Sequence, residues 1–253
     1  MIDLHTHILP GLDDGARTLE ESVAIARAAV ADGIRVVAAT PHVRDDYPTE
    51  VTEMQEGVAE LREALTVEGV ELDVLTGGEI ALDHLALLDT DELARFGLAG
   101  NRNYLLLEFP YYGWPLDLET RAFELRGNGF VIVLAHPERN AEVQSAPARL
   151  QRLVEQDALV QLTGASVDGR LGRTARKTAF QLLELGLAHL VASDAHTPDV
   201  RAVGLASAAE AVADIALARW LTEAVPAAIV AGNQIPDRPP ARRSRSLAAR
   251  RRR

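Results

Sequence analysis

Seven short apolar runs, separated by longer segments with helical patterns, constrain the fold of this chain more than any other feature. The runs are rich in Val, Leu and Ile and start about 30 residues apart, the length of one β/α unit. Almost continuous apolarity is typical of strands buried on both faces of a parallel sheet. The runs occupy residues 2–5, 34–40, 70–79, 103–109, 129–136, 158–166 and 189–196. We therefore predict an α/β fold, a (β/α) barrel of seven or eight strands, with an open doubly wound sheet as the alternative.

The first intervening segment shows the helical signals most clearly. Thr18 and Glu21 have the spacing of a capping box, an apolar stripe follows them, and Gly33 stands where the helix should end. We predict a helix between the first two strands, as a β/α unit requires.

Composition and charge exclude several classes of protein. The chain has 253 residues, 47% of them hydrophobic, and no cysteine, which excludes thiolate ligands and a cysteine nucleophile. Residues 238–253 contain eight arginines and no acid; without them 18 basic residues face 37 acidic ones, a net charge of -19. So acidic a body argues against nucleic-acid binding. We expect a barrel domain over residues 1–235, a disordered basic tail over 236–253, and a cytoplasmic location. The tail is expected to be a solvated extension, with contact to an anionic surface as an alternative.

Ionisable side chains gather where the predicted strands end. The carboxyl ends of parallel barrel strands form one rim, and active sites of such barrels lie there. Five of the seven histidines occupy these positions. The candidates are His5, His7, Asp14, His42, Glu79, Glu108, His136, Asp194 and His196, together with Arg139 and Arg201.

Nine imidazoles and carboxylates at one rim predict a metal centre. This donor set suits Mn²⁺, Zn²⁺ or Fe²⁺, and nine donors are too many for one ion but enough for two or three. His5 and His7 are two residues apart on a strand, so both rings should face the same ion. His84 and His189 do not fit the pattern and are predicted to be structural. Asp3 and Asp13 are either partners of the ligating histidines or ordinary loop and strand residues.

The motifs at these positions resemble those of a known family. In order they read DLHTHILPGLDDG, ATPHV, GGEI, LLEFP, AHPERN and SDAH, between Met1 and about Asn233. They are similar to the PHP (polymerase and histidinol phosphatase) superfamily, and within it to the manganese-dependent protein-tyrosine phosphatases of the CpsB/CapC type. The resemblance implies a distorted (β/α)₇ TIM-like barrel with three metal ions.

The resemblance also implies roles for individual residues. One ion would be held by His5, His7, Glu79 and Asp194, and a third by Asp14, His42 and His196. The second would be held by Glu79, Glu108 and His136, with Glu79 bridging. Arg139 and Arg201 would bind phosphate and act in catalysis. Thr163 stands where the family has an asparagine, two residues after Gln161.

The implied activity is metal-dependent hydrolysis of phosphotyrosine on a protein by a metal-activated hydroxide. Mn²⁺ is the expected ion, with Fe, Zn or Mg as alternatives. By analogy the substrate is a bacterial tyrosine kinase that controls polysaccharide synthesis and export. The aromatic-rich segment 109–118 could wall the pocket for a phenyl ring, or serve only loop packing or an oligomer contact.

Other functions stay open at this point. The same donors would suit a small-molecule phosphatase of the histidinol-phosphate type. A metal-dependent amidohydrolase or DNase also begins with two such histidines. Those proteins typically carry a lysine that bridges two metal ions, or a different later motif pattern, whereas the only lysine here, Lys177, falls in a predicted helix. A non-catalytic PHP regulatory module would usually have lost ligands, and this chain has all of them.

Overall fold

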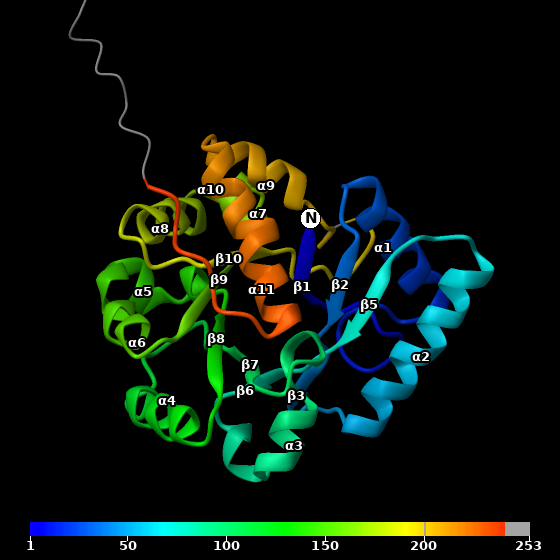
Figure 1. Cartoon of the computed structure of the whole chain (residues 1–253), viewed down its shortest axis with the longest axis horizontal. Coiled ribbons are helices and arrows are strands. Elements are labelled where there is room, and N and C mark those ends of the chain that lie inside the picture. Colours follow the sequence, from blue (N-terminus) through cyan, green and yellow to red (C-terminus); the bar gives the residue numbers. More distant parts are fainter. Residues whose placement is uncertain (200, 241–253) are drawn as a thin grey trace, which may run out of the picture.

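The computed structural model describes residues 1–199 and 201–240 (Figure 1). Its strands form two sheets, and every strand pair is parallel except β3–β4. The first sheet has the order β1 (Ile2–Thr6), β2 (Val36–Ala39) and β5 (Asp73–Thr76). The second has the order β10 (Leu190–Ala192), β9 (Leu159–Thr163), β8 (Val131–Ala135), β7 (Tyr104–Glu108), β6 (Glu79–Ala81), β3 (His42–Arg44) and β4 (Tyr47–Pro48).

The two sheets together make one wall of seven strand positions. The chain leaves β2 and after two residues enters β3 in the other sheet, and it passes in the same way from β5 to β6. The first and last strands meet through a parallel bridge between Thr6 and Ala195. Neighbouring first and last strands are typical of a barrel, whereas in an open sheet they would lie apart. The predicted α/β class with seven β/α units is confirmed. Among the described residues, however, the hydrogen bonds between neighbouring strands do not form one continuous closed sheet.

The passage from β5 to β6 depends on two glycines. A Cβ on Gly78 would lie 2.8 Å from a ring carbon of Phe96 and 3.0 Å from a methyl carbon of Val43, closer than packed carbons approach. Glycine therefore lets the backbone pass close to Phe96 and Val43 just before Glu79, the first residue of β6.

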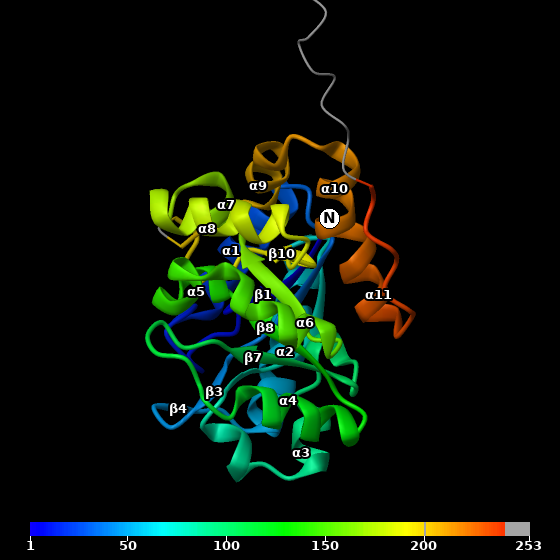
Figure 2. The same ribbon diagram turned by 90° about the vertical axis from the view of Figure 1, so that its left-hand side faces the viewer.

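Helices surround the strands, as Figures 1 and 2 show from two sides. They are α1 (Leu19–Ala31), α2 (Val51–Val67), α3 (Thr90–Arg95), α4 (Leu118–Gly127), α5 (Ala141–Ser145), α6 (Gln151–Glu155), α7 (Gly164–Asp168), α8 (Arg173–Glu184), α9 (Leu205–Val212), α10 (Ile215–Arg219) and α11 (Val225–Ala231). Short 3₁₀ helices span His84–Leu87, Leu98–Gly100, Pro137–Arg139 and Pro147–Leu150, and a π-helical turn spans Trp220–Ala224. None of the helices in the described ranges is both long and apolar enough to span a bilayer.

The predicted helix after the first strand is present as α1, and its cap differs in detail. The Thr18 hydroxyl accepts a hydrogen bond from the Glu21 N–H at 3.3 Å, as expected. The Glu21 carboxylate, however, accepts from the N–H and guanidinium of Arg17 rather than from Thr18. The capping box is thus half formed, because an arginine competes for the acidic side chain. Gly33, with φ of +85°, follows the helix end.

The core explains why the strand segments read as continuous apolar runs. Every residue of β9 is buried, as are all but the first of β8 and all but the last of β7. Side chains on one face fill the barrel interior and those on the other pack under helices. The exceptions to apolarity fall at the strand ends.

Part of the predicted tail lies against the domain. The Trp220 indole donates a hydrogen bond to the Pro236 carbonyl at 2.9 Å, and the Arg238 guanidinium donates to the Leu183 carbonyl. The boundary at residue 235 therefore does not separate the segment 236–240 from the body. Residues 241–253, with most of the arginines, lie outside the described part of the chain.

Candidate metal centre

The nine predicted ligands come together at the carboxyl ends of the strands. His5 lies in β1 and His7 directly follows it, whereas His42 and Glu79 begin β3 and β6. The other residues end a strand or lie just beyond one: Asp14, Glu108, His136, Asp194 and His196. Seven of the nine are buried, Glu108 is partly buried and Asp14 is exposed. The positions predicted from the strand pattern are thus neighbours in space.

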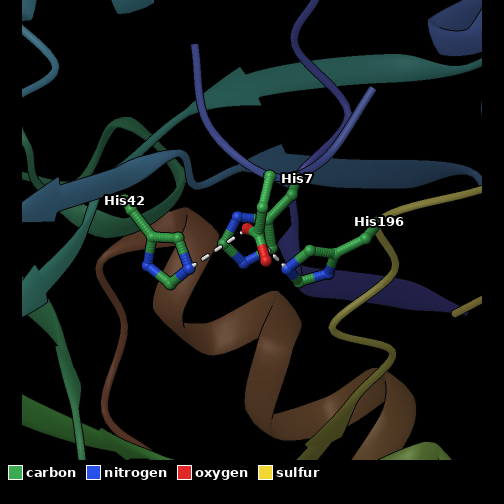
Figure 3. Close-up of side chains that lie close together, drawn as sticks. His7, His42 and His196 are labelled. Atoms are coloured by element: carbon green, nitrogen blue, oxygen red, sulfur yellow. Dashed lines mark ion pairs between the residues drawn. The ribbon is translucent and has the colours of Figure 1, made fainter. Parts of the chain in front are cut away.

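Donor atoms of these residues form four overlapping groups. Within each group one atom per residue lies within 4.8 Å of the others. The groups are His7, Asp14, His42 and His196; His5, His7 and Asp194; His5, Glu79 and His136; and His42, Glu79 and Glu108. The sets implied by the resemblance divide the same nine residues differently. In the structure His136 and Glu108 fall into separate groups that share Glu79, Glu79 is not grouped with His7 and Asp194, and His7 joins the group of Asp14. Figure 3 shows His7, His42 and His196 converging; the dashed lines are ion pairs of His42 and His196 with Asp14, at 3.4 and 3.2 Å.

Glu79 is the hub of the centre. Its Oε2 atom lies 3.0 Å from His42 Nδ1, 3.3 Å from His5 Nε2 and 3.4 Å from His7 Nε2. Its Oε1 atom lies 2.9 Å from His136 Nε2. One fully buried carboxylate thus faces four imidazoles, two from the end of β1, one from β3 and one from the end of β8.

Spacing and missing hydrogen bonds both fit a metal site. The His5 and His7 Nε2 atoms are 3.2 Å apart, and they lie 3.5 and 3.4 Å from Asp194 Oδ1. Donors about 2.1 Å from one ion would be about 3.0 to 3.4 Å apart in octahedral or tetrahedral coordination. Glu79 Oε2, His42 Nδ1 and His196 Nε2 are buried without a hydrogen-bond partner in the described structure. Such unpartnered atoms at the spacing of metal donors are consistent with a cation site.

The charges of the centre favour cations. Burial alone would raise the pKa values of Glu79 and Asp194, but neighbouring imidazoles hold both well below their ordinary values. Burial opposes protonation of His42 as well, yet hydrogen bonds to Asp14 and Glu79 raise its pKa to about 9. Burial and the nearby His7 lower the pKa of His196 to about 4. The carboxylates are thus ionised at neutral pH, and protons compete with metal ions for some of the imidazoles.

Two polar groups orient the first pair of histidines. Asp13 Oδ2 lies 2.6 Å from His7 Nδ1, and Gln161 Oε1 lies 3.0 Å from His5 Nδ1. An acceptor on Nδ1 fixes the tautomer, so that the Nε2 lone pair points into the centre. Asp13 is therefore a histidine partner, whereas Asp3 accepts from the N–H groups of His5 and Ser193 and meets no ring.

Two of the clustered residues have a left-handed backbone. His136 has φ of 39° and Asp194 has φ of 55°, a region that residues other than glycine seldom adopt. Their N–H groups are held by the carbonyls of Gln161 and His5, each at 2.9 Å. Such strain is typical of functional sites, where the surrounding structure compensates for it.

Three arginines border the centre. Arg139 and Arg201 both contact Asp194 Oδ2, at 2.7 and 3.4 Å, and Arg201 also lies 3.2 Å from Asp14. The sequence motifs indicated these two arginines but not the third. Arg44 lies two residues after His42 and forms an ion pair with Glu108 at 3.0 Å. Its position in β3, beside a ligand candidate, is the signal that could have revealed it.

The two remaining histidines lie outside the four groups. His189 Nδ1 accepts a hydrogen bond from the Val160 N–H at 3.1 Å, and its ring packs near Trp220. His84 lies 3.3 Å from Asp45. Neither residue joins a cluster of metal-binding side chains among the described residues, in line with their predicted structural roles.

The aromatic segment contacts both the metal centre and its own loop. Tyr111 stacks on His136, with ring centres 5.9 Å apart and planes 5° from parallel. The Arg139 guanidinium lies 4.7 Å from the centre of the Tyr111 ring. Trp114 instead packs against Phe109. Tyr111 therefore borders the metal centre, whereas Trp114 serves loop packing.

Comparison with known proteins agrees with this architecture. The chain is 39% identical over 203 residues to the tyrosine-protein phosphatase YwqE of Bacillus subtilis (strain 168), covering 79% of each chain. It is 29% identical over 209 residues to the tyrosine-protein phosphatase CpsB of Streptococcus pneumoniae, covering 79% of this chain and 85% of CpsB. A chain from crystal structures of YwqE and CpsB, described as unique metal-dependent tyrosine phosphatases, superposes with a TM-score of 0.86 at 33% identity, over 96% of this chain and 100% of that one. Residues 1–224 match the family described as capsular polysaccharide synthesis, CpsB/CapC. The chain therefore belongs to the CpsB/CapC family.

Proposed function

We propose that this protein is a metal-dependent phosphatase that removes phosphate from tyrosine side chains of a protein substrate. One observation carries the proposal: nine imidazoles and carboxylates converge at one rim, and two guanidiniums border them by contacting the same carboxylate, Asp194. The family and the names of its relatives agree with it.

The donor set supports two or three ions, of which Mn²⁺ is the one we propose. Five imidazoles mixed with four carboxylates suit Mn²⁺, Fe²⁺ or Zn²⁺, with Mg²⁺ as a further alternative. When bound, such ions would activate a water molecule near neutral pH and offset charge on the phosphoryl oxygens. We propose all nine clustered residues as ligands, with Glu79 shared between ions.

The arginines would hold the phosphoryl group. Asp194 contacts each guanidinium through one nitrogen, and Asp14 contacts a second nitrogen of Arg201, so the N–H groups outside these contacts would serve the phosphate oxygens. Arginine donates to phosphate in a bidentate way, and charge that develops on the oxygens in the transition state strengthens these bonds. A phenolate leaves readily, so the proposal assigns no general acid. A chain without cysteine also needs no covalent cysteine intermediate.

We further propose that the substrate is a bacterial tyrosine kinase of polysaccharide synthesis, met in the cytoplasm. The support is the family's description and the activity named for its relatives.

Hydrolysis assays test the proposal directly. After chelation, the protein should be inactive on a phosphotyrosine peptide, and Mn²⁺ should restore the activity. Phosphoserine peptide and histidinol phosphate should be hydrolysed much more slowly. Faster hydrolysis of histidinol phosphate would assign the protein to the small-molecule class, and no hydrolysis of any substrate with any divalent ion would refute the proposal. Elemental analysis of purified protein identifies the ion.

A further inference from the structure

A large open groove adjoins the metal centre at Glu108 and Tyr111. Its volume is about 650 Å³, and its walls come from the loops that follow β3, β6 and β7. Apolar contact surface is provided by Leu82, Pro110 and Pro115. The groove is large enough for one or two amino-acid side chains in addition to a phosphorylated ring placed at the arginines.

The groove carries an excess of negative charge. Four aspartates line it besides Glu108: Asp45, Asp46, Asp83 and Asp117. The two arginines in its wall are already paired, Arg44 with Glu108 and Asp46, and Arg121 with Asp117. Asp83 forms no ion pair within the described residues and no helix-cap hydrogen bond, so its charge is not offset.

A second, smaller hollow borders the centre at Asp13 and Asp14. Its volume is about 420 Å³, and its lining also includes Glu21 and Asp199. The one arginine in this lining, Arg17, is paired with Glu21 at 2.6 Å. Both hollows that adjoin the centre are therefore acidic, although the arginines beside Asp194 are suited to an anion.

We propose that the groove at Glu108 and Tyr111 receives the residues next to the phosphotyrosine, and that its aspartates favour basic side chains there over acidic ones. The inference rests on the proposed function. A phosphate held by Arg139 and Arg201 places the peptide chain at the mouth of the centre, where the groove is the larger of the two open hollows beside it. Complementary charge at such a surface changes association and specificity more than the chemical step.

The test compares phosphotyrosine peptides that differ only in their flanking charge. One peptide carries lysines and the other glutamates at the two positions before and the two after the phosphotyrosine. We expect kcat/KM to be about tenfold higher for the lysine peptide at low salt, and the ratio to approach one at about 1 M salt, where the Debye length is about 3 Å. Equal kcat/KM values at low salt would refute the inference.

Charge variants locate the effect. Asp83→Asn should lower the lysine-to-glutamate ratio two- to threefold, and Asp83→Lys should lower it further. Glu71→Lys is the matched control: Glu71 is exposed and precedes β5, at the opposite rim, and the change in net charge is the same as in Asp83→Lys. A ratio unchanged by Asp83→Lys, or lowered equally by Glu71→Lys, would contradict the groove as its source.

Para-nitrophenyl phosphate separates this inference from the proposed function. It has no flanking residues, so the Asp83→Asn and Asp83→Lys variants should hydrolyse it at the wild-type rate. If para-nitrophenyl phosphate is hydrolysed and the lysine and glutamate peptides are hydrolysed at equal rates, the proposed phosphatase activity stands and the charge preference alone is overturned. No hydrolysis of any of the three would overturn the proposed function itself.

Discussion

Asp13→Asn tests whether the metal centre depends on the orientation of His7. Asp13 Oδ2 lies 2.6 Å from His7 Nδ1 and also accepts from the His42 N–H at 3.0 Å, while Oδ1 accepts from the Gly15 N–H at 2.9 Å. Although burial would raise the pKa of Asp13, the His7 imidazole lowers it, so the carboxylate is ionised at neutral pH. Asparagine keeps the size of the side chain and loses its charge.

The size of the effect follows from this one contact. A hydrogen bond to a charged group contributes about 1.5 to 3 kcal/mol, which corresponds to about 10- to 150-fold in a binding constant. Outer partners of metal-binding histidines typically contribute 10- to 100-fold in affinity or activity. We therefore expect Asp13→Asn to weaken Mn²⁺ binding about 10- to 100-fold, with a comparable loss of turnover at limiting metal.

Calorimetric titration with Mn²⁺ measures the change, and Asp3→Asn is the matched control. Asp3 lies in β1, before the loop that holds Asp13, and its burial raises its pKa to about 6; its partners are the backbone N–H groups of His5 and Ser193 and the Ser193 side chain, not an imidazole. The control should lose several-fold less affinity. Wild-type affinity in Asp13→Asn, or equal losses in both variants, would refute the argument that the imidazole contact carries the effect. Circular dichroism checks that both variants fold.

Three further predictions concern other parts of the molecule. Glu79→Gln removes the charge shared by the clusters and should lower metal content and reduce turnover at least ~10²-fold; full activity with full metal content would contradict the bridging role. Arg139→Ala should keep the metal, measured by elemental analysis, and lower kcat for aryl phosphates more than it raises KM. His189 has a pKa lowered to about 4 by burial and by Arg238, so the unfolded chain binds the proton more tightly and stability should fall as the pH drops from 6.5 to 4. In the variant His189→Asn, the loss of unfolding free energy between pH 6.5 and pH 4 should be smaller by up to about 3 kcal/mol. Urea unfolding with chelator present measures it, and the same pH dependence of stability in wild type and variant would contradict the prediction.

Local patterns in the sequence predicted the strands and most of the centre because both depend on position along a single strand. Apolar runs end where a strand reaches the rim, so His42, Glu79 and His136 could be placed at the rim without knowing their neighbours. The alternation of β1 likewise placed both rings of the first histidine pair on one face, and both Nε2 atoms do approach the same Asp194 oxygen.

Long-range geometry was harder to predict. Which ligands share an ion depends on how the strand ends of the two sheets come together, and neither the division into two sheets nor the close backbone passage at Gly78 has a local hydrophobic signal. For the same reason the pairing of Arg44 with Glu108, 64 residues apart, could not be read from either motif. The orientation of His5 by Gln161 joins residues 156 positions apart. Such contacts exist only once the barrel brings the strand ends together.

The left-handed residues His136 and Asp194 have a consequence for the supply of metal to this protein. Hydrogen bonds to neighbouring strands hold both backbones, so the cost of their conformation, about 1 to 2 kcal/mol each, falls on folding of the barrel and not on the uptake of ions. An ion would then find both donors already placed, so its binding would need no local change of the backbone at these two residues, unlike in a zinc finger, whose fold forms only with its ion. Metal returned to the chelated protein should therefore restore activity without a refolding step.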